Sequence, residues 1–236
     1  MTAVLEAHGL HKRFGGVHAL RGAGLRVAHG ELVGLFGPNG AGKTTLFNLI
    51  AGSFAPDAGS ILLDGHEIGA LPAWRRARLG VARTFQITRP FRDLSVLENV
   101  LAAQPAGGAI SHAAARTLLL QVGLAARADD PAGALTLGML KRLEVARALA
   151  LRPRLLLLDE PLAGLSGREA SALLDFVVTL RPQAGIVMVE HNVRQSLPVC
   201  DRAVVMDAGA IIAEGLPEEI RTNPAVIRAY LGEEAA

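Results

Sequence analysis

Short, uninterrupted runs of apolar residues recur along the chain, each bounded by polar or turn-forming residues. The clearest runs are Leu32–Phe36, 155–158 and Gly185–Val189. Runs of this length without polar alternation are typical of strands buried on both faces of a parallel sheet. A further strand is predicted at 80–85, and the segment 167–181 has a helical pattern. The apolar pattern therefore predicts an α/β fold around a parallel sheet.

Shorter elements are predicted on either side of these runs. The apolar run that ends at Phe36 is followed by a short predicted helix, 46–52, that stops at a glycine. The remaining predictions are short strands at 3–10 and 25–28 around a loop at 12–17, hairpins at 57–66 and 203–213, and a terminal helix from about Pro217. These patterns add an antiparallel β flank to the predicted core.

A long block in the middle of the chain has no strand pattern. Its first helix is predicted from Ser95 and Glu98, which have the spacing of a capping box. Helical pattern continues to about residue 150, with breaks at 104–109 and 129–133. We therefore expect a helical lobe inserted into the α/β core.

A short basic helix is predicted at 71–79. It carries Trp74 and three arginines, Arg75, Arg76 and Arg78. A solvated basic face with one buried indole ring explains this composition, because arginine is mostly exposed in folded proteins.

Composition limits the classes of function. The 236 residues suit one α/β domain, alone or with a small lobe. Lys plus Arg is 24 against 22 for Asp plus Glu, so the net charge of +2 gives no electrostatic case for nucleic acid as a partner.

The one cysteine, Cys200, allows no internal disulfide and fits a reducing compartment. No apolar run reaches about 18 residues, so we expect no membrane span, and we expect no secretory signal.

A glycine-rich segment between the strand Leu32–Phe36 and the helix after it has the spacing G-x-x-x-x-G-K-[ST] of a phosphate-binding loop. Its glycines let consecutive backbone N–H groups point inward at phosphate oxygens, and the helix adds the positive end of its dipole. We expect Lys43 to reach the β- and γ-phosphates and the Thr44 hydroxyl to bind Mg²⁺. The segment comprises Gly37, Pro38, Asn39, Gly40, Ala41, Gly42, Lys43, Thr44 and Thr45. The sequence therefore predicts a nucleoside triphosphate site.

Polar residues follow three of the predicted strands. Asp159 and Glu160 end the leucine run, where two carboxylates would be costly to bury unless they meet a cation. In a phosphate-loop protein the first is the Mg²⁺-side aspartate, and the second can polarise the attacking water. Gln86 ends the strand at 80–85 and can bond Mg²⁺ or its waters, and His191 follows Gly185–Val189. The carboxyl ends of parallel strands line the ligand crevice, so both can reach it, although an isolated histidine is more often structural.

Two further candidates are ambiguous on local sequence. Phe14, beside two glycines, is equally compatible with a ring that stacks on adenine and with a core residue at a strand end. The segment 135–139 places Thr136 and Gly138 at a helix N-terminus, a geometry that can bind anions. An ordinary capped helix explains this local pattern at least as well.

Taken together and in this order, these motifs resemble the nucleotide-binding subunits of ABC transporters over nearly the whole chain. Phe14 matches the adenine-stacking aromatic residue, 37–45 matches Walker A and Gln86 matches the Q-loop. The remaining matches are 135–139 to the signature, 155–159 with Glu160 to Walker B and its catalytic acid, and His191 to the switch histidine. The resemblance implies a P-loop, RecA-like α/β fold that binds ATP and Mg²⁺ and hydrolyses ATP.

Within that family, the chain looks most like the ATPase subunits of branched-chain amino acid importers. The segments that carry this are 82–86, 90–99, 159–165, 189–192, 213–215 and 227–232. The signature departs from the usual L-S-G-G-Q, because Thr136, Leu137 and Met139 replace the Ser, the first Gly and the Gln. Thr136 keeps a hydroxyl and Gly138 keeps close backbone approach, whereas Met139 lacks the amide.

The resemblance implies how the chain works. Two ATPase subunits, identical or homologous, sandwich two ATP molecules, each between Walker A of one chain and the signature of the other. Lys43 and the loop amides hold the phosphates, Thr44, Asp159 and Gln86 hold Mg²⁺, Glu160 polarises water, and His191 contacts the γ-phosphate. The partners implied are two integral membrane permease subunits, docked near Gln86 and Phe91, and indirectly a periplasmic solute-binding protein. The chain would then lie at the cytoplasmic face of the inner membrane.

The expected organisation is a single ABC ATPase domain, with a core lobe at about 1–88 and 152–236 and a helical lobe at about 89–151. Two rival functions stay open at this point. One is an export or lipid-extraction ATPase of the same family, and the other is a non-transport ABC ATPase such as an iron–sulfur assembly component. Co-purification with polytopic membrane proteins would separate a transporter from a scaffold component.

Overall fold

The computed structural model describes residues 2–103 and 108–234, in which the strands form two sheets. The larger sheet has six strands in the order β10-β9-β3-β8-β7-β6, and all neighbours are parallel except β9 and β10. Its strands are β3 (Leu32–Phe36), β6 (Val81–Arg83), β7 (Leu155–Asp159), β8 (Gly185–Val189), β9 (Arg202–Asp207) and β10 (Ala210–Gly215). The predicted parallel α/β core is confirmed.

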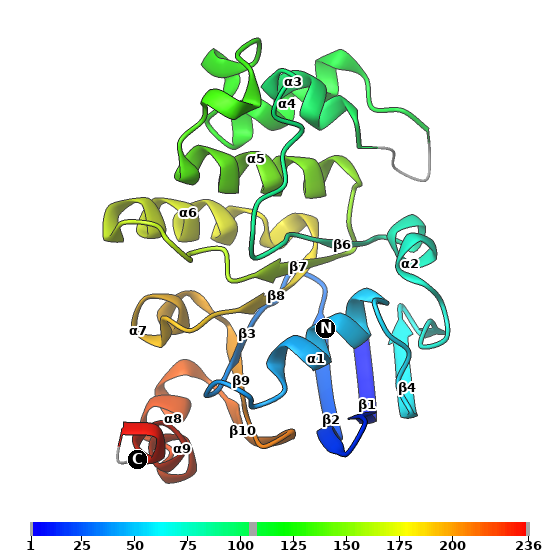
Figure 1. Cartoon of the computed structure of the whole chain (residues 1–236), viewed down its shortest axis with the longest axis vertical. Helices are drawn as coiled ribbons and strands as arrows, with labels where there is room; N and C mark the ends of the chain where they lie inside the picture. Colours follow the sequence, from blue (N-terminus) through cyan, green and yellow to red (C-terminus); the bar gives the residue numbers. More distant parts are fainter. Residues whose placement is uncertain (1, 104–107, 235–236) are drawn as a thin grey trace.

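The central strands are buried on both faces, as their apolar runs predict. In β7, Leu155 and Leu157 pack into one hydrophobic cluster, whereas Leu156 and Leu158 pack into another on the opposite face. The first cluster joins the sheet to α1 (Lys43–Ala51) and to the second sheet. The second cluster joins it to α6 (Gly167–Thr179) and part of α5 (Leu137–Ala150). The sheet is therefore the middle layer of the molecule (Figure 1).

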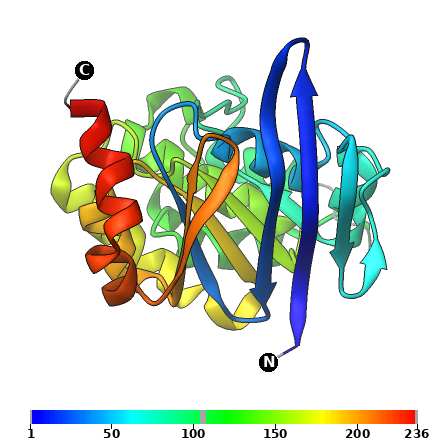
Figure 2. The same ribbon diagram turned by 90° about the horizontal axis from the view of Figure 1, so that it is seen from below.

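The second sheet is antiparallel, in the order β2-β1-β4-β5. Its strands are β1 (Ala3–Phe14), β2 (Val17–Ala28), β4 (Ala58–Leu63) and β5 (His66–Glu67). Figure 2 shows β1 and β2 as a long ribbon that extends along the molecule. The expected loop at 12–17 is wrong, because the strands continue to Phe14 and restart at Val17. Register shifts in the β1–β2 pair break the alternation of apolar residues, which hides the outer half of this hairpin from the sequence pattern.

The inserted helical lobe lies above the parallel sheet in Figure 1. It contains α3 (Val96–Leu101), α4 (His112–Gln121) and most of α5, which share a hydrophobic cluster of their own. The Ser95–Glu98 capping box at the start of α3 is confirmed. The expected break at 129–133 is also confirmed, and of the break at 104–109, residues 104–107 lie outside the described part of the chain.

The C-terminal segment differs from the prediction. Instead of one helix from Pro217, it forms α8 (Pro217–Thr222) and α9 (Pro224–Glu234). Asn223 between them is extended, with φ −69° and ψ 120°, because the ring of Pro224 disfavours the helical conformation of the residue before it. The remaining short elements are α2 (Ala73–Leu79), α7 (Val193–Ser196) and four single 3₁₀ turns at 125–127, 132–134, 181–183 and 197–199. Within the described residues, none of the helices has the length and apolarity needed to cross a membrane.

The basic helix α2 corrects the expectation for its side chains. Trp74 is 57% exposed, with the guanidinium groups of Arg75 and Arg78 over its ring at 5.1 and 5.5 Å. Arg76 is instead fully buried, and its guanidinium donates hydrogen bonds to the carbonyl oxygens of Leu49, Ile50, Gly69 and Leu71. Leu49 and Ile50 belong to the last turn of α1, where carbonyl groups have no partner within the helix. Arg76 therefore caps the helix that begins in the phosphate-binding loop.

We expect Arg76→Met to lower the free energy of unfolding by about 3 kcal/mol, because the variant buries carbonyl groups without a donor. Arg75→Met on the same helix removes an exposed guanidinium and should change stability by less than about 0.5 kcal/mol. Urea unfolding followed by circular dichroism measures both values. Equal stability of the two variants would contradict the capping role of Arg76.

Candidate active site

The glycine-rich loop connects the end of β3 to the start of α1. Gly37 has a φ of +139°, and a Cβ atom placed there would lie 2.1 Å from the carbonyl oxygen of Met206. At Gly42, with φ +100°, a Cβ atom would lie 2.7 Å from the carbonyl oxygen of Ala19. The N–H of Gly37 donates to the hydroxyl of Tyr230 in α9 at 2.8 Å. Glycine is therefore required at two positions, and the C-terminal helix holds the entry to the loop.

Lys43 is the first residue of α1, and its side chain reaches back to the backbone of the loop. Its side chain is buried, and Nζ donates to the carbonyl oxygens of Gly37 at 2.6 Å and Pro38 at 2.7 Å. The loop and its lysine thus form a compact unit in which the ammonium group lies beside the backbone that would surround a phosphate.

Glu160 lies at the meeting point of three strand ends. Its Oε2 accepts a hydrogen bond from Nε2 of Gln86 at 2.8 Å, and its Oε1 lies 2.8 Å from Nε2 of His191. Gln86 follows β6, Glu160 follows β7 and His191 follows β8. The parallel sheet therefore brings together three residues that are far apart in the sequence.

Asp159 lies one residue earlier, at the end of β7, and is buried. Burial raises the pKa of its carboxyl group above the usual value, while the positive charge of Arg83 opposes that rise. Nη2 of Arg83 lies 3.2 Å from Oδ2 of Asp159. The carboxylate thus already has a cation beside it, as the cost of burying a charge requires.

A cavity of about 460 Å³ joins the loop to this group of strand-end residues. Gln86, Glu160 and His191 line it together with the phosphate-binding loop and the start of β2. Its lining comprises Val17, His18, Ala19, Arg21, Asn39, Gly40, Ala41, Gly42, Lys43, Thr44, Thr45, Gln86, Glu160, His191 and Ala208. One cavity is therefore lined by both a general-base candidate and a phosphate-binding loop, a combination suited to phosphoryl transfer to water.

Several predicted residues lie elsewhere. Among the described residues, the cavity lining does not include Phe14, which is 44% exposed and packs edge-on against Phe54 with 5.4 Å between ring centroids. It does not include Thr136 and Gly138 either, which lie at the N-terminus of α5. The Thr136 hydroxyl accepts from the N–H of Met139 and caps the helix. The lining also lacks Gly37, Pro38 and Asp159, so one chain brings together residues 39–45 with Gln86, Glu160 and His191 but not the signature.

The sequence interpretation missed two buried charges around this site. Glu144 accepts a hydrogen bond from the N–H of Phe85 at 2.7 Å, and burial raises its pKa to about 7. Lys141 donates to the carbonyl oxygens of Gln86 and Glu160. The signal was present, because Lys141, Glu144 and Ala148 have the i, i+3, i+7 spacing of the buried face of α5.

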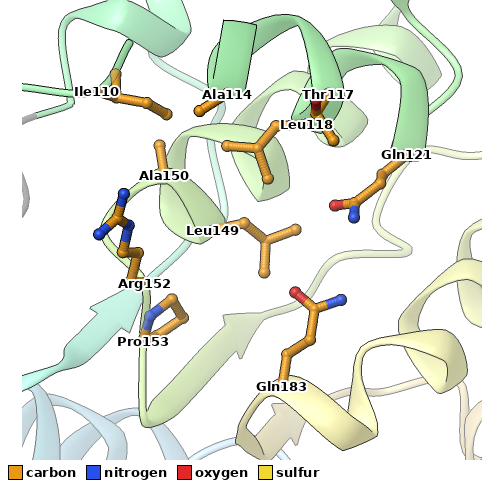
Figure 3. A pocket seen from close by; sticks show the side chains of 10 residues that line it. All are labelled: Ile110, Ala114, Thr117, Leu118, Gln121, Leu149, Ala150, Arg152, Pro153 and Gln183. Atoms are coloured by element: carbon orange, nitrogen blue, oxygen red, sulfur yellow. The ribbon is translucent and has the colours of Figure 1, made fainter.

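A second cavity of about 460 Å³ lies apart from this site, between α4, the end of α5 and the turn that contains Gln183 (Figure 3). Leu118 and Leu149 form its apolar wall, and Arg152, Gln121 and Gln183 lie at its rim. Its lining residues include no carboxylate and no histidine. This cavity therefore contains no candidate general base among its lining residues.

Comparisons with known proteins show the family to which the chain belongs. Residues 20–163 match the model of the ABC transporter family, and residues 210–236 match a model described as branched-chain amino acid ATP-binding cassette transporter. The chain is 42% identical to BraF of Pseudomonas aeruginosa and 40% identical to LivG of Escherichia coli K12, both high-affinity branched-chain amino acid transport ATP-binding proteins, with 98% of each chain covered.

The ADP conformation of MJ1267, an ATP-binding cassette of an ABC transporter, superposes with a TM-score of 0.90 at 29% identity, covering 98% of this chain and 100% of that one. With a family match over more than half its length and relatives at this identity, the chain belongs to the ABC transporter family of nucleotide-binding, ATP-hydrolysing cassettes.

Proposed function

We propose that this chain hydrolyses ATP to drive the import of branched-chain or other hydrophobic amino acids, or of related small solutes. The observation that carries the hydrolytic part is the position of Glu160, which lies 2.8 Å from both Gln86 and His191 and lines the same cavity as the phosphate-binding loop. The C-terminal match and the names of BraF and LivG support the solute class.

In the proposed mechanism, the loop amides and Lys43 bind the phosphates of ATP. Lys43 exchanges its hydrogen bonds with the carbonyl oxygens of Gly37 and Pro38 for contacts with the β- and γ-phosphates. Glu160 accepts a proton from the attacking water, and His191 contacts the γ-phosphate. The groups are held in place before the reaction, so catalysis rests on positioning and on stabilisation of developing charge.

Mg²⁺ suits the donors of Thr44 and Gln86, which line the cavity, and of Asp159, which directly precedes Glu160. Thr44 supplies a hydroxyl, Gln86 an amide oxygen and Asp159 a carboxylate, which are the hard oxygen ligands that Mg²⁺ takes alongside phosphates and water. When bound, Mg²⁺ would neutralise phosphate oxygens. The contact of Arg83 with Asp159 supports this assignment, because it shows that the buried carboxylate favours a neighbouring positive charge.

A second ATPase subunit would complete the site. Thr136 and Gly138 lie outside the cavity of their own chain, and they would face the γ-phosphate bound to the partner's Walker A. The partner is a second copy of this chain or a homologous ATPase. The altered signature residues Leu137 and Met139 favour a division of labour between two non-identical subunits.

The groove between the two lobes is the proposed docking place for the permease subunits. It is lined by the aromatic rings of Phe85 and Phe91 and by arginines that include Arg89 and Arg147. The guanidinium of Arg147 lies 5.0 Å from the ring of Phe91, and Phe91 is 50% exposed. Exposed aromatic rings beside cations suit a protein partner, which here would be two integral membrane permeases served by a periplasmic solute-binding protein.

This partnership would hold the chain at the cytoplasmic face of the inner membrane. We also propose that the chain is one domain, with a core lobe at about 1–88 and 152–236 and a helical lobe at about 89–151. The separate hydrophobic cluster of α3, α4 and α5 supports a lobe with its own core.

We expect Glu160→Gln to lower the rate of ATP hydrolysis by about a hundredfold or more, because the amide keeps the shape but cannot accept the proton of water. ATP binding should persist. Phosphate release and binding of a fluorescent ATP analogue measure the two properties. Glu218→Gln, at an exposed site in α8, is the matched control and should hydrolyse normally. Normal turnover by Glu160→Gln would exclude this glutamate as the general base.

If Phe14 stacks on adenine, Phe14→Ala should weaken ATP binding by roughly 1–3 kcal/mol, the range for stacking of a base on an aromatic ring. Phe14→Tyr should bind normally. Phe91→Ala removes an exposed ring far from the phosphate-binding loop in sequence and is the control. A loss of stability in Phe14→Ala with unchanged nucleotide affinity would show that the ring only packs against Phe54.

Thr136→Arg tests whether the signature acts on the partner's nucleotide. The bulky cation should leave ATP binding by the isolated chain intact, because Thr136 does not line its own cavity. In the assembled complex, it should impair nucleotide trapping at the site built on the partner's Walker motifs, as measured with labelled subunits. Loss of ATP binding in the isolated variant would mean that the signature serves its own site.

A further inference from the structure

Lys141 is a buried cation that connects the helical lobe to the candidate active site. It lies in α5, and only 4% of the residue is exposed. Its Nζ donates to the carbonyl oxygen of Gln86 at 2.8 Å and to that of Glu160 at 3.2 Å. In Figure 1, α5 lies between the parallel sheet and the rest of the helical lobe. One ammonium group therefore holds the backbone of two residues whose side chains meet in the cavity.

The backbone of Glu160 is in a conformation that needs such support. Its φ is +45°, in the left-handed region that residues with a side chain adopt only when their surroundings hold them there. The N–H of Glu160 donates to the carbonyl oxygen of Val189 at 3.0 Å, and the carbonyl oxygen accepts from Nζ of Lys141 and from the N–H of Ala163, each at 3.2 Å. Both backbone polar groups of Glu160 are therefore hydrogen-bonded, and Lys141 is the donor that comes from the helical lobe.

Four nearby carboxylates compensate the buried positive charge of Lys141. Burial of an ammonium group is unfavourable unless it is paired. The carboxylates of Glu144, Glu190, Asp159 and Glu160 all attract it. A neutral side chain at this position would remove one compensating charge from this group of acids and one hydrogen-bond donor from the carbonyl groups of Gln86 and Glu160.

We propose that Lys141 is a positioning residue for ATP hydrolysis, which fixes Gln86 and Glu160 relative to each other through their carbonyl oxygens. The inference rests on the proposed role of Glu160 as general base. Helix α5 would then contribute to ATP hydrolysis at two places. Thr136 caps its N-terminus and Gly138 lies in its first turn, so one rigid helix connects the signature to Glu160 of the same chain.

Lys141→Met in the full-length chain tests the proposal, because methionine fills similar space without donating a hydrogen bond. We expect the ATP turnover number to fall by about ten- to a hundredfold, as a displacement of roughly 1 Å at a reacting group can cause. The affinity for ATP should stay within about twofold, because Lys141 is not among the residues that line the cavity. Lys141→Arg keeps the charge and the donor and should recover most of the turnover.

Arg142→Met is the matched control. Arg142 is the next residue of α5, and its guanidinium donates to the carbonyl oxygen of Val122 within the helical lobe at 3.3 Å. This variant loses the same charge from the same helix without touching Gln86 or Glu160, so its turnover should stay normal. If Lys141→Met and Arg142→Met lower turnover equally, Lys141 acts only through the stability of the lobe and the proposal is wrong.

A double-mutant cycle with Glu160→Gln separates the two proposals. If Lys141 acts through Glu160, adding Lys141→Met to Glu160→Gln should lower the single-turnover rate no further. Normal turnover by Lys141→Met beside a slow Glu160→Gln would overturn the positioning role alone. Normal turnover by Glu160→Gln would overturn the proposed function itself. If Lys141→Met does not fold, Lys141→Gln, whose shorter, uncharged side chain does not reach as far as Nζ, is expected to bind ATP normally and hydrolyse it slowly, and normal hydrolysis by that variant would likewise overturn the role.

Discussion

The structure depends on how the negative charges of two carboxylates at the end of β7 are compensated. The leucines of β7 are buried, alternately on the two faces of the sheet, and the strand ends at Asp159, which Glu160 follows. Burial raises the pKa of the Asp159 carboxyl group. Charges in such a position are costly unless cations and hydrogen bonds surround them. Arg83 pairs with Asp159, and Lys141 approaches from α5. The same compensation that lets the chain fold also leaves Glu160 beside the phosphate-binding loop.

The core could be predicted from the sequence because its signals are local. An apolar run without alternation indicates a strand buried on both faces, so β3, β7 and β8 were predicted at nearly their observed bounds. The carboxyl ends of parallel strands share one edge, so the convergence of Gln86 and His191 on the crevice followed from their positions after β6 and β8. The roles of these residues in hydrolysis stay predictions.

Features that depend on distant contacts could not be predicted in this way. Arg76 is buried because the last turn of α1 presents carbonyl groups to it, and nothing in the local sequence of α2 distinguishes it from its exposed neighbours. The outer half of the β1–β2 ribbon is interrupted by register shifts, which remove the alternation on which strand prediction rests. The spacing of Lys141 on α5 is that of a buried face, but its partners could not be predicted, because they lie beyond the ends of β6 and β7.

These contacts connect the fold to the proposed function through α5, whose first turn carries the signature and whose buried face reaches Glu160. The central claim is that ATP binds in the cavity between the phosphate-binding loop and Glu160. The most direct measurement is an experimental structure of the full chain with Mg²⁺ and a non-hydrolysable ATP analogue. The account predicts phosphates within the loop and Lys43 Nζ moved from the carbonyl oxygens of Gly37 and Pro38 to the β- and γ-phosphates. A nucleotide bound elsewhere, with Lys43 still on those carbonyl oxygens, would contradict it.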